Sequence, residues 1–168
     1  FSYQGLAQFG VVDWLMYELP KKYTLNLNMS NVLTGSFTFT MVNQFVLLLI
    51  LVIAVLSLIE SRFLGFAIIA YFLHSFFYNS YLHQTLLLRY QYKFKELLRI
   101  RIIFSILRFC IEVTSILLVG IYGFLVVEAI IFLIPIFLLS PYIKLRPNFG
   151  SLYKKYFFYL KKGRAFFA

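Results

Sequence analysis

The sequence is poor in charged residues and in cysteine, and each shortage excludes a class of protein. Only 13% of the 168 residues are charged and 62% are hydrophobic, whereas a soluble domain has about 25% charged residues. Together with a mean hydropathy of +0.85, this composition excludes an ordinary soluble domain and indicates an integral membrane protein. The single cysteine, Cys110, cannot form an internal disulfide and has no metal-ligand spacing around it.

The sequence also lacks the motifs of common catalytic sites. It has no Gly-rich phosphate loop, no Cys/His cluster and no Ser/His/Asp arrangement, so we expect no chemistry on a bound organic substrate and no cofactor. His74 and His83 would lie about 13 Å apart in height on one helix and would not share an iron. Each is open to two interpretations, a haem or metal ligand or a hydrogen-bonded packing residue, and the second is commoner for a lone histidine among aromatic residues.

The apolar runs predict helices. A membrane β-barrel would alternate polar and apolar residues along its strands, and the sequence has no such alternation. Two runs, 37–59 and 63–82, are separated only by a short polar segment that ends at Arg62. Because one crossing needs about 20 residues, the two runs predict a pair of membrane-spanning helices joined as a hairpin.

A longer apolar stretch follows between residues 99 and 144. It is about twice as long as one crossing requires. Gly120 and Gly123 offer a fold point near its middle, because glycine relaxes the backbone. We therefore expect a second hairpin, with spans near 102–119 and 122–140.

These runs predict an all-α integral membrane protein with about four transmembrane helices in two hairpins plus interfacial amphipathic helices. Pro135 should bend the fourth span, because proline removes the backbone hydrogen bond to Ile131. The expected parts are an interfacial N-terminal segment over 1–36 that ends in a polar loop over 26–36, a four-span membrane domain over 37–140 that includes a basic amphipathic surface helix at 83–101, and a basic tail over 141–168.

The net charge of +10 is distributed unevenly. In a soluble protein it would suggest nucleic acid as a partner, but here the basic residues gather beside the apolar spans, as the positive-inside rule describes. We therefore expect no nucleic acid and a basic side that faces matrix or cytoplasm. Four spans place both termini and 83–101 on that side. The tail beyond Pro141 has seven basic residues and no acid, so anionic membrane lipids are expected partners.

Two acids lie inside the second apolar stretch, where a carboxylate is costly and is a functional candidate by default. Glu112 precedes the predicted turn by about nine residues and Glu128 follows it by about seven, so both should lie roughly 10–14 Å from it, at similar depth. Arg108 is one helical turn before Glu112 and could hold its charged form. Two interpretations stay open: a proton-handling site, or a structural ion pair of Arg108 and Glu112 with Glu128 bound to a neighbouring subunit.

Two segments resemble the NADH dehydrogenase subunit 4L family, a small membrane-arm subunit of respiratory complex I. The stretch IIFSILRFCIEVTSILL, which follows the basic Arg99 and Arg101, resembles the family's first glutamate-bearing helix, and LVVEAIIFLIPIFLL resembles the second. The resemblance covers roughly 63–144 and leaves out the first span and the basic tail. It implies that Glu112 and Glu128 belong to a proton-conducting path between membrane subunits.

The composition adds an expectation about location. Phe (21 residues) and Tyr (13 residues) are abundant, and this bias resembles proteins translated from AT-rich organelle genomes. The expected function is a membrane subunit of a mitochondrial respiratory-chain complex, most simply the proton-translocating arm of complex I, in the inner membrane with both termini on the matrix side. Its partners would be the other membrane subunits, and it would be at most a non-catalytic subunit of the oxidoreductase. The alternative is a lineage-specific structural accessory subunit of a respiratory complex or ATP synthase that packs against core subunits and lipid.

Overall fold

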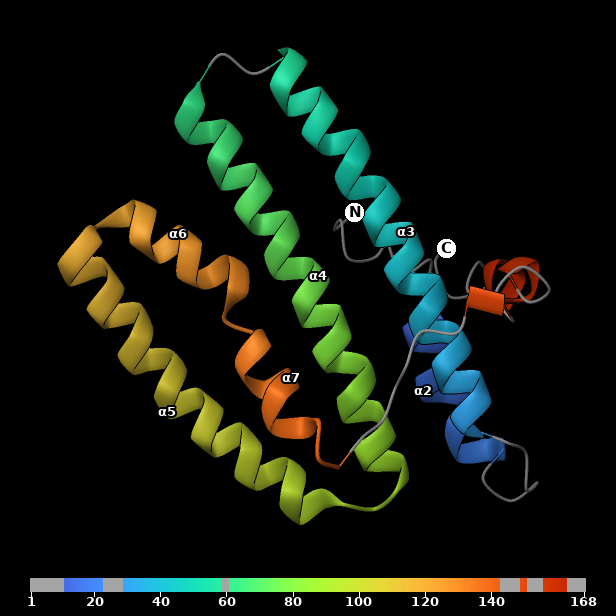
Figure 1. Cartoon of the computed structure of the whole chain (residues 1–168). Coiled ribbons are helices and arrows are strands. Elements are labelled where there is room, and N and C mark those ends of the chain that lie inside the picture. The colour runs from blue at the N-terminus through green and yellow to red at the C-terminus, as the bar shows by residue number, and fades with distance from the viewer. Residues whose placement is uncertain (1–10, 23–28, 59–60, 143–148, 151–155, 163–168) are drawn as a thin grey trace.

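The computed structural model of the chain describes residues 11–22, 29–58, 61–142, 149–150 and 156–162. These residues form helices joined by short turns, and no strand occurs among them. Four helical stretches are long and apolar enough to cross a membrane (Figure 1): Val32–Ser57, Arg62–Tyr90, Phe94–Val119 and Ile121–Leu139. The prediction of an all-α membrane protein with four spans in two hairpins is confirmed. Most of the predicted basic tail and residues 1–10 of the N-terminal segment lie outside the described residues.

The first hairpin consists of α3 (Met29–Leu58) and α4 (Arg62–Tyr90), which lie side by side along their length (Figure 1). Helix α3 begins at Met29, so the prediction of a loop over 26–36 is wrong for residues 29–36. Residues 26–28 lie outside the described residues. The polar side chains there fit into a helix because their hydroxyls donate to backbone carbonyls of the preceding turn. Ser36 donates to Leu33 O at 2.9 Å, and Thr40 donates to Ser36 O at 2.9 Å.

The predicted surface helix at 83–101 does not exist as a separate element. Its first part completes α4, and its second part begins α5 (Phe94–Val119). The chain reverses between them at Tyr92, whose φ of 56° is left-handed, and Lys93 N donates to Leu88 O at 3.0 Å to close the turn. The amphipathic pattern arises because His83 and the residues of the last α4 turns are buried against other helices.

The second hairpin folds at Gly120, as predicted, and returns as α6 (Ile121–Ile130). Gly120 has φ 74° and ψ −153°, a conformation that favours glycine. The predicted bend near Pro135 is also confirmed, because the returning span breaks after Ile130 and resumes as α7 (Leu133–Leu139). Pro135 has no N–H for the Ile131 carbonyl, and Ile134 N donates to that carbonyl instead at 3.2 Å, in a tighter turn.

Phe132, at the break between α6 and α7, is the centre of an aromatic core. Its ring centroid lies 5.1 Å from that of Tyr78, 5.5 Å from that of Tyr81 and 5.4 Å from that of Phe104. These residues join α4 and α5 to the returning span. An edge-on pair such as Phe132 with Tyr78 stabilises a core beyond the area that it buries. The bend in the fourth span therefore places the Phe132 side chain between α4 and α5.

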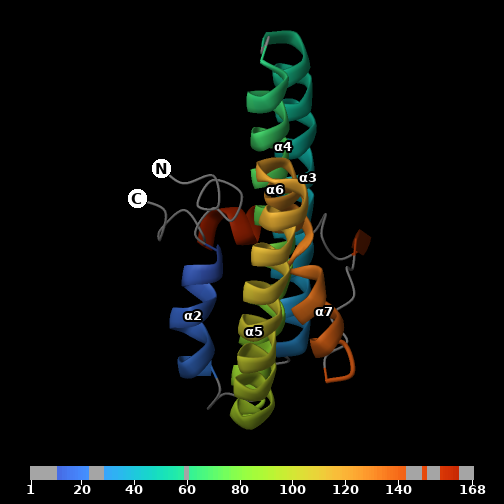
Figure 2. The ribbon, with the colours of Figure 1, turned by 90° about the vertical axis from the view of Figure 1, so that its left-hand side faces the viewer.

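Two short helices pack beside α3. Helix α2 (Val11–Lys22) buries Trp14, and it stands beside the spans in a side view (Figure 2). A helix over 156–162 places Tyr156 OH 2.8 Å from Asn43 Oδ1 and Tyr159 OH 3.2 Å from Val32 O. Burial raises the pKa of Tyr159 to about 12. The close approach depends on Gly35, since a Cβ there would collide with the Tyr159 ring.

The turn between α5 and α6 gives a testable prediction. A Cβ on Gly120 would meet no atom within 4 Å, so Gly120→Ala adds backbone strain alone and should cost about 1–3 kcal/mol of stability. The measurement is unfolding of the purified protein in mixed micelles, with Ser105→Ala, an exposed change on α5, as the control. Equal stability of Gly120→Ala and the parent would show that the turn tolerates a side chain.

Candidate functional site

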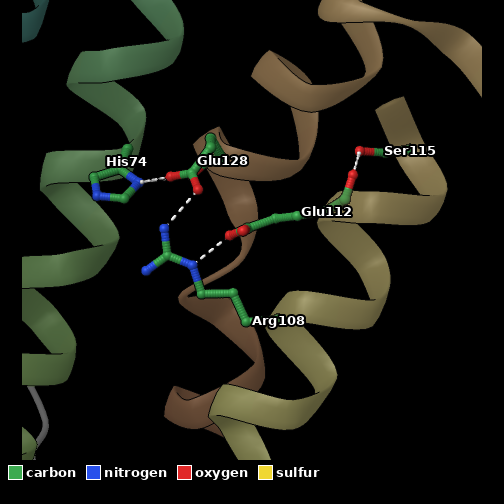
Figure 3. Close-up of polar contacts among 5 residues, drawn as sticks. All are labelled: His74, Arg108, Glu112, Ser115 and Glu128. Carbon is green, nitrogen blue, oxygen red and sulfur yellow. Dashed lines mark hydrogen bonds and ion pairs between the residues drawn. The ribbon is translucent and has the colours of Figure 1, made fainter. Parts of the chain in front are cut away.

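Arg108 lies between the two glutamates of the second hairpin and binds both (Figure 3). Its Nε donates to Oε1 of Glu112, one turn further along α5, and its Nη2 donates to Oε1 of Glu128 on α6 at 2.6 Å. The expectation that both carboxylates lie at similar depth on adjacent helices agrees with this geometry. The hairpin turn at Gly120 produces it, because it returns α6 along α5 with Glu128 opposite Arg108.

His74 on α4 completes the cluster. Its Nδ1 lies 2.9 Å from Glu128 Oε2 and 2.8 Å from the Glu128 backbone oxygen. Both partners are acceptors, so Nδ1 carries the hydrogen. We call the set of Arg108, Glu112, Glu128 and His74 the charge cluster. The sequence did not pair His74 with Glu128, because they are 54 positions apart on helices that no local pattern links.

The charge cluster is only partly shielded within this chain. The exposed fraction of the side chain is 35% for Arg108, 21% for Glu112, 18% for Glu128 and 20% for His74. An open pocket of about 320 Å³ lies against it, with Ala67, Ala70, Tyr71 and Leu125 among its lining residues. Ala67 and Ala70 have small side chains, so the wall that α4 contributes to this pocket is shallow. The charge cluster is therefore accessible from outside the helix bundle.

The aromatic core contacts the charge cluster through Phe132. The Arg108 guanidinium lies 5.8 Å from the centroid of the Phe132 ring, and the His74 ring meets Phe132 edge-on at 5.0 Å. A cation above an aromatic face is attracted by the ring quadrupole. Phe132 therefore positions both the guanidinium and the imidazole, which links the bend at Pro135 to the geometry of the cluster.

The charges of the cluster do not cancel. Glu112 and Glu128 contribute two negative charges and Arg108 one positive charge, which leaves −1 when His74 is neutral. One added proton, on His74 or on a carboxylate, makes the cluster neutral. An apolar surrounding favours neutral groups over a net charge, so a single proton decides whether the cluster carries a net charge.

His83 and Cys110 lie outside the charge cluster. His83 is fully buried, and its Nδ1 donates to Asn79 O at 2.9 Å, which agrees with the packing interpretation. Cys110 is exposed and carries no disulfide. No group of three or more His, Cys, Asp or Glu side chains that could hold a metal ion is found within the described part of the chain.

Comparison of the chain with protein-family models, with curated proteins and with solved structures finds no match.

The shared guanidinium predicts strong energetic coupling between Arg108 and Glu128. Removing either partner leaves the other charge unpaired, so Arg108→Leu and Glu128→Gln should each destabilise the protein. The double variant should lose less than the sum of the two, by about 0.5–3 kcal/mol. Reversible unfolding in mixed micelles measures this double-mutant cycle.

The control cycle uses Arg101, an exposed basic residue on the same helix. Arg101→Leu and Glu128→Gln should be additive to within about 0.5 kcal/mol. Equal coupling in the two cycles would contradict a specific ion pair between Arg108 and Glu128.

Proposed function

We propose that the chain is a membrane subunit of a mitochondrial respiratory-chain complex and that its charge cluster lies on a proton path. The observation that carries this proposal is the convergence of Arg108, Glu112, Glu128 and His74 from three membrane-spanning helices. Ionisable groups are rare within spans and typically mark ion or proton pathways. A cluster that becomes neutral on gaining one proton can hold that proton for a time and release it again, as a proton relay requires.

The chemistry of the proposed relay follows from its hydrogen bonds. A proton that reaches the second nitrogen of His74 converts the ring to an imidazolium. The Nδ1 proton can then pass across 2.9 Å to Glu128 Oε2, which leaves a neutral ring. Arg108 holds the carboxylates of Glu128 and Glu112 at once, so a change of charge on one alters the attraction to the other. The cluster would relay a proton without any cofactor in this chain.

Within this proposal, the specific complex is the membrane arm of complex I. The glutamate pair on adjacent spans and the resemblance to the subunit 4L family support it. The Phe- and Tyr-rich composition and the basic segments beside the spans support an organelle-encoded protein of the inner membrane, with both termini on the matrix side. The partners would be the larger membrane subunits of the arm, together with anionic lipid.

A structural accessory subunit of a respiratory complex or ATP synthase is the second candidate. It is favoured by the exposed apolar surface of α5, because only 6% of the most apolar stretch of this span is buried within the described part of the chain. Such a surface fits contact with lipid or with neighbouring hydrophobic subunits. In that case the ion pairs of Arg108 would fasten α5 to α6 and carry no proton.

Purification of the native assembly separates these two candidates. An affinity tag on this chain should recover the membrane-arm subunits of an NADH:ubiquinone oxidoreductase, identified by mass spectrometry after native electrophoresis. Recovery of ATP synthase or of another respiratory complex would contradict the complex I assignment and favour the accessory role.

Glu112→Gln tests the proton path. It removes a charge with little change of shape, so the complex should assemble normally while proton translocation coupled to substrate oxidation falls several-fold. The measurement is the proton uptake of inner-membrane vesicles at a known oxidation rate. Glu96→Gln, in the first turn of α5, is the matched control and should translocate protons normally. Normal coupling in an assembled Glu112→Gln complex would overturn the proton-path role.

A further inference from the structure

A second group of polar side chains is buried inside the α3–α4 hairpin. Gln44 on α3 and Ser75, Asn79 and His83 on α4 are each at most 1% exposed. We call these four residues the polar seam. Ser75, Asn79 and His83 recur every four residues, so they follow one side of α4 over about 12 Å.

Contacts across the hairpin place α3 along the whole seam. Gln44 Nε2 donates to Ser75 O at 3.3 Å at one end, and the ring of Phe37 lies 5.7 Å from the ring of His83 at the other. The seam therefore runs from the neighbourhood of His83 to Ser75. Ser75 directly follows His74 in α4, so the seam reaches the charge cluster along the backbone, while the two side chains point to different sides of the helix.

Two seam residues carry buried polar atoms that find no hydrogen-bond partner among the described residues. They are Oγ of Ser75 and Nε2 of His83. The other nitrogen of His83 donates to Asn79 O, so Nε2 of the neutral ring is a bare acceptor. The Ser75 hydroxyl is both a donor and an acceptor. Buried polar atoms in proteins are almost always satisfied, by protein or by ordered water.

The two groups identify the ligand. An anion would be repelled by the acceptor nitrogen of His83. A metal cation would find no carboxylate to compensate its charge, because all four seam residues are neutral when His83 is neutral. Water both donates and accepts, and it is small enough to lie between packed helices.

We propose that the polar seam binds internal water and supplies protons to His74. The water site stands by itself, whereas the supply of protons rests on the proposed function of the charge cluster. Hydrogen-bonded water passes a proton on by accepting one and releasing another. In Figure 3 the second ring nitrogen of His74 lies on the side of the ring away from Glu128. This nitrogen can therefore accept a proton from a donor other than Glu128.

Radiolytic hydroxyl-radical footprinting of the native complex tests the water site, because radicals form from water and oxidise the side chains beside it. Phe37 and Phe104 form a matched pair, with exposed fractions of 6% and 7%. Phe37 adjoins His83, whereas Phe104 packs in the aromatic core. We expect Phe37 and His83 to be oxidised several-fold faster than Phe104. Equal protection of Phe37 and Phe104 would overturn the water site.

Proton translocation tests the supply role. His83→Phe fills the seam with an apolar ring and should slow coupled translocation several-fold, whereas His83→Gln keeps a polar side chain and should retain most of it. If only His83→Gln assembles, Ser75→Val replaces His83→Phe. Normal coupling in a seam variant, while Glu112→Gln is impaired, would overturn proton supply and leave the charge cluster in place. Normal coupling in Glu112→Gln as well would count against the proposed function, whereas the footprinting decides the water site independently.

Discussion

The rest of the structure depends on the two ion pairs that Arg108 makes with Glu112 and Glu128. Inside an apolar span, an unpaired carboxylate or guanidinium carries a large desolvation cost. Arg108 satisfies two carboxylates on two helices at once, so α5 and α6 have one register in which all three charges are paired. The turn at Gly120, the bend before Pro135 and the position of Phe132 are all consistent with that register.

Much of the fold could be predicted because it follows from patterns that are local in the sequence. The lengths of the apolar runs predicted four spans, Gly120 marked the second turn, and Pro135 marked the bend. The boundary between α4 and α5 was predicted wrongly because the amphipathic period over 83–101 is the same for a surface helix and for two helix ends packed in a bundle. Only tertiary contacts distinguish these cases, and the left-handed residue at the reversal is Tyr92, which carries no turn signal.

The candidate site was also predictable in part, because some of its residues are close together in the sequence. Arg108 and Glu112 are four residues apart, which predicted their pairing, and the hairpin predicted the depth of Glu128. The side of its helix that Glu128 faces did not follow from spacing, so its ion pair with Arg108 was not predicted. The pairing of His74 with Glu128 depends on how α4 packs against α6, and no sequence spacing encodes it. The polar seam was hidden for a similar reason, because its residues are scattered among apolar neighbours and become a set only when α3 and α4 are laid together.

The contacts of the helix over 156–162 impose an order on biosynthesis. Asn43 belongs to α3, which is synthesised before the three spans that follow it, and its oxygen accepts a hydrogen bond from Tyr156, which is synthesised more than a hundred residues later. Gly35 leaves space that the Tyr159 ring fills. Helix α3 therefore enters the membrane with an incomplete surface, and this surface can be closed only after the three following spans have been made.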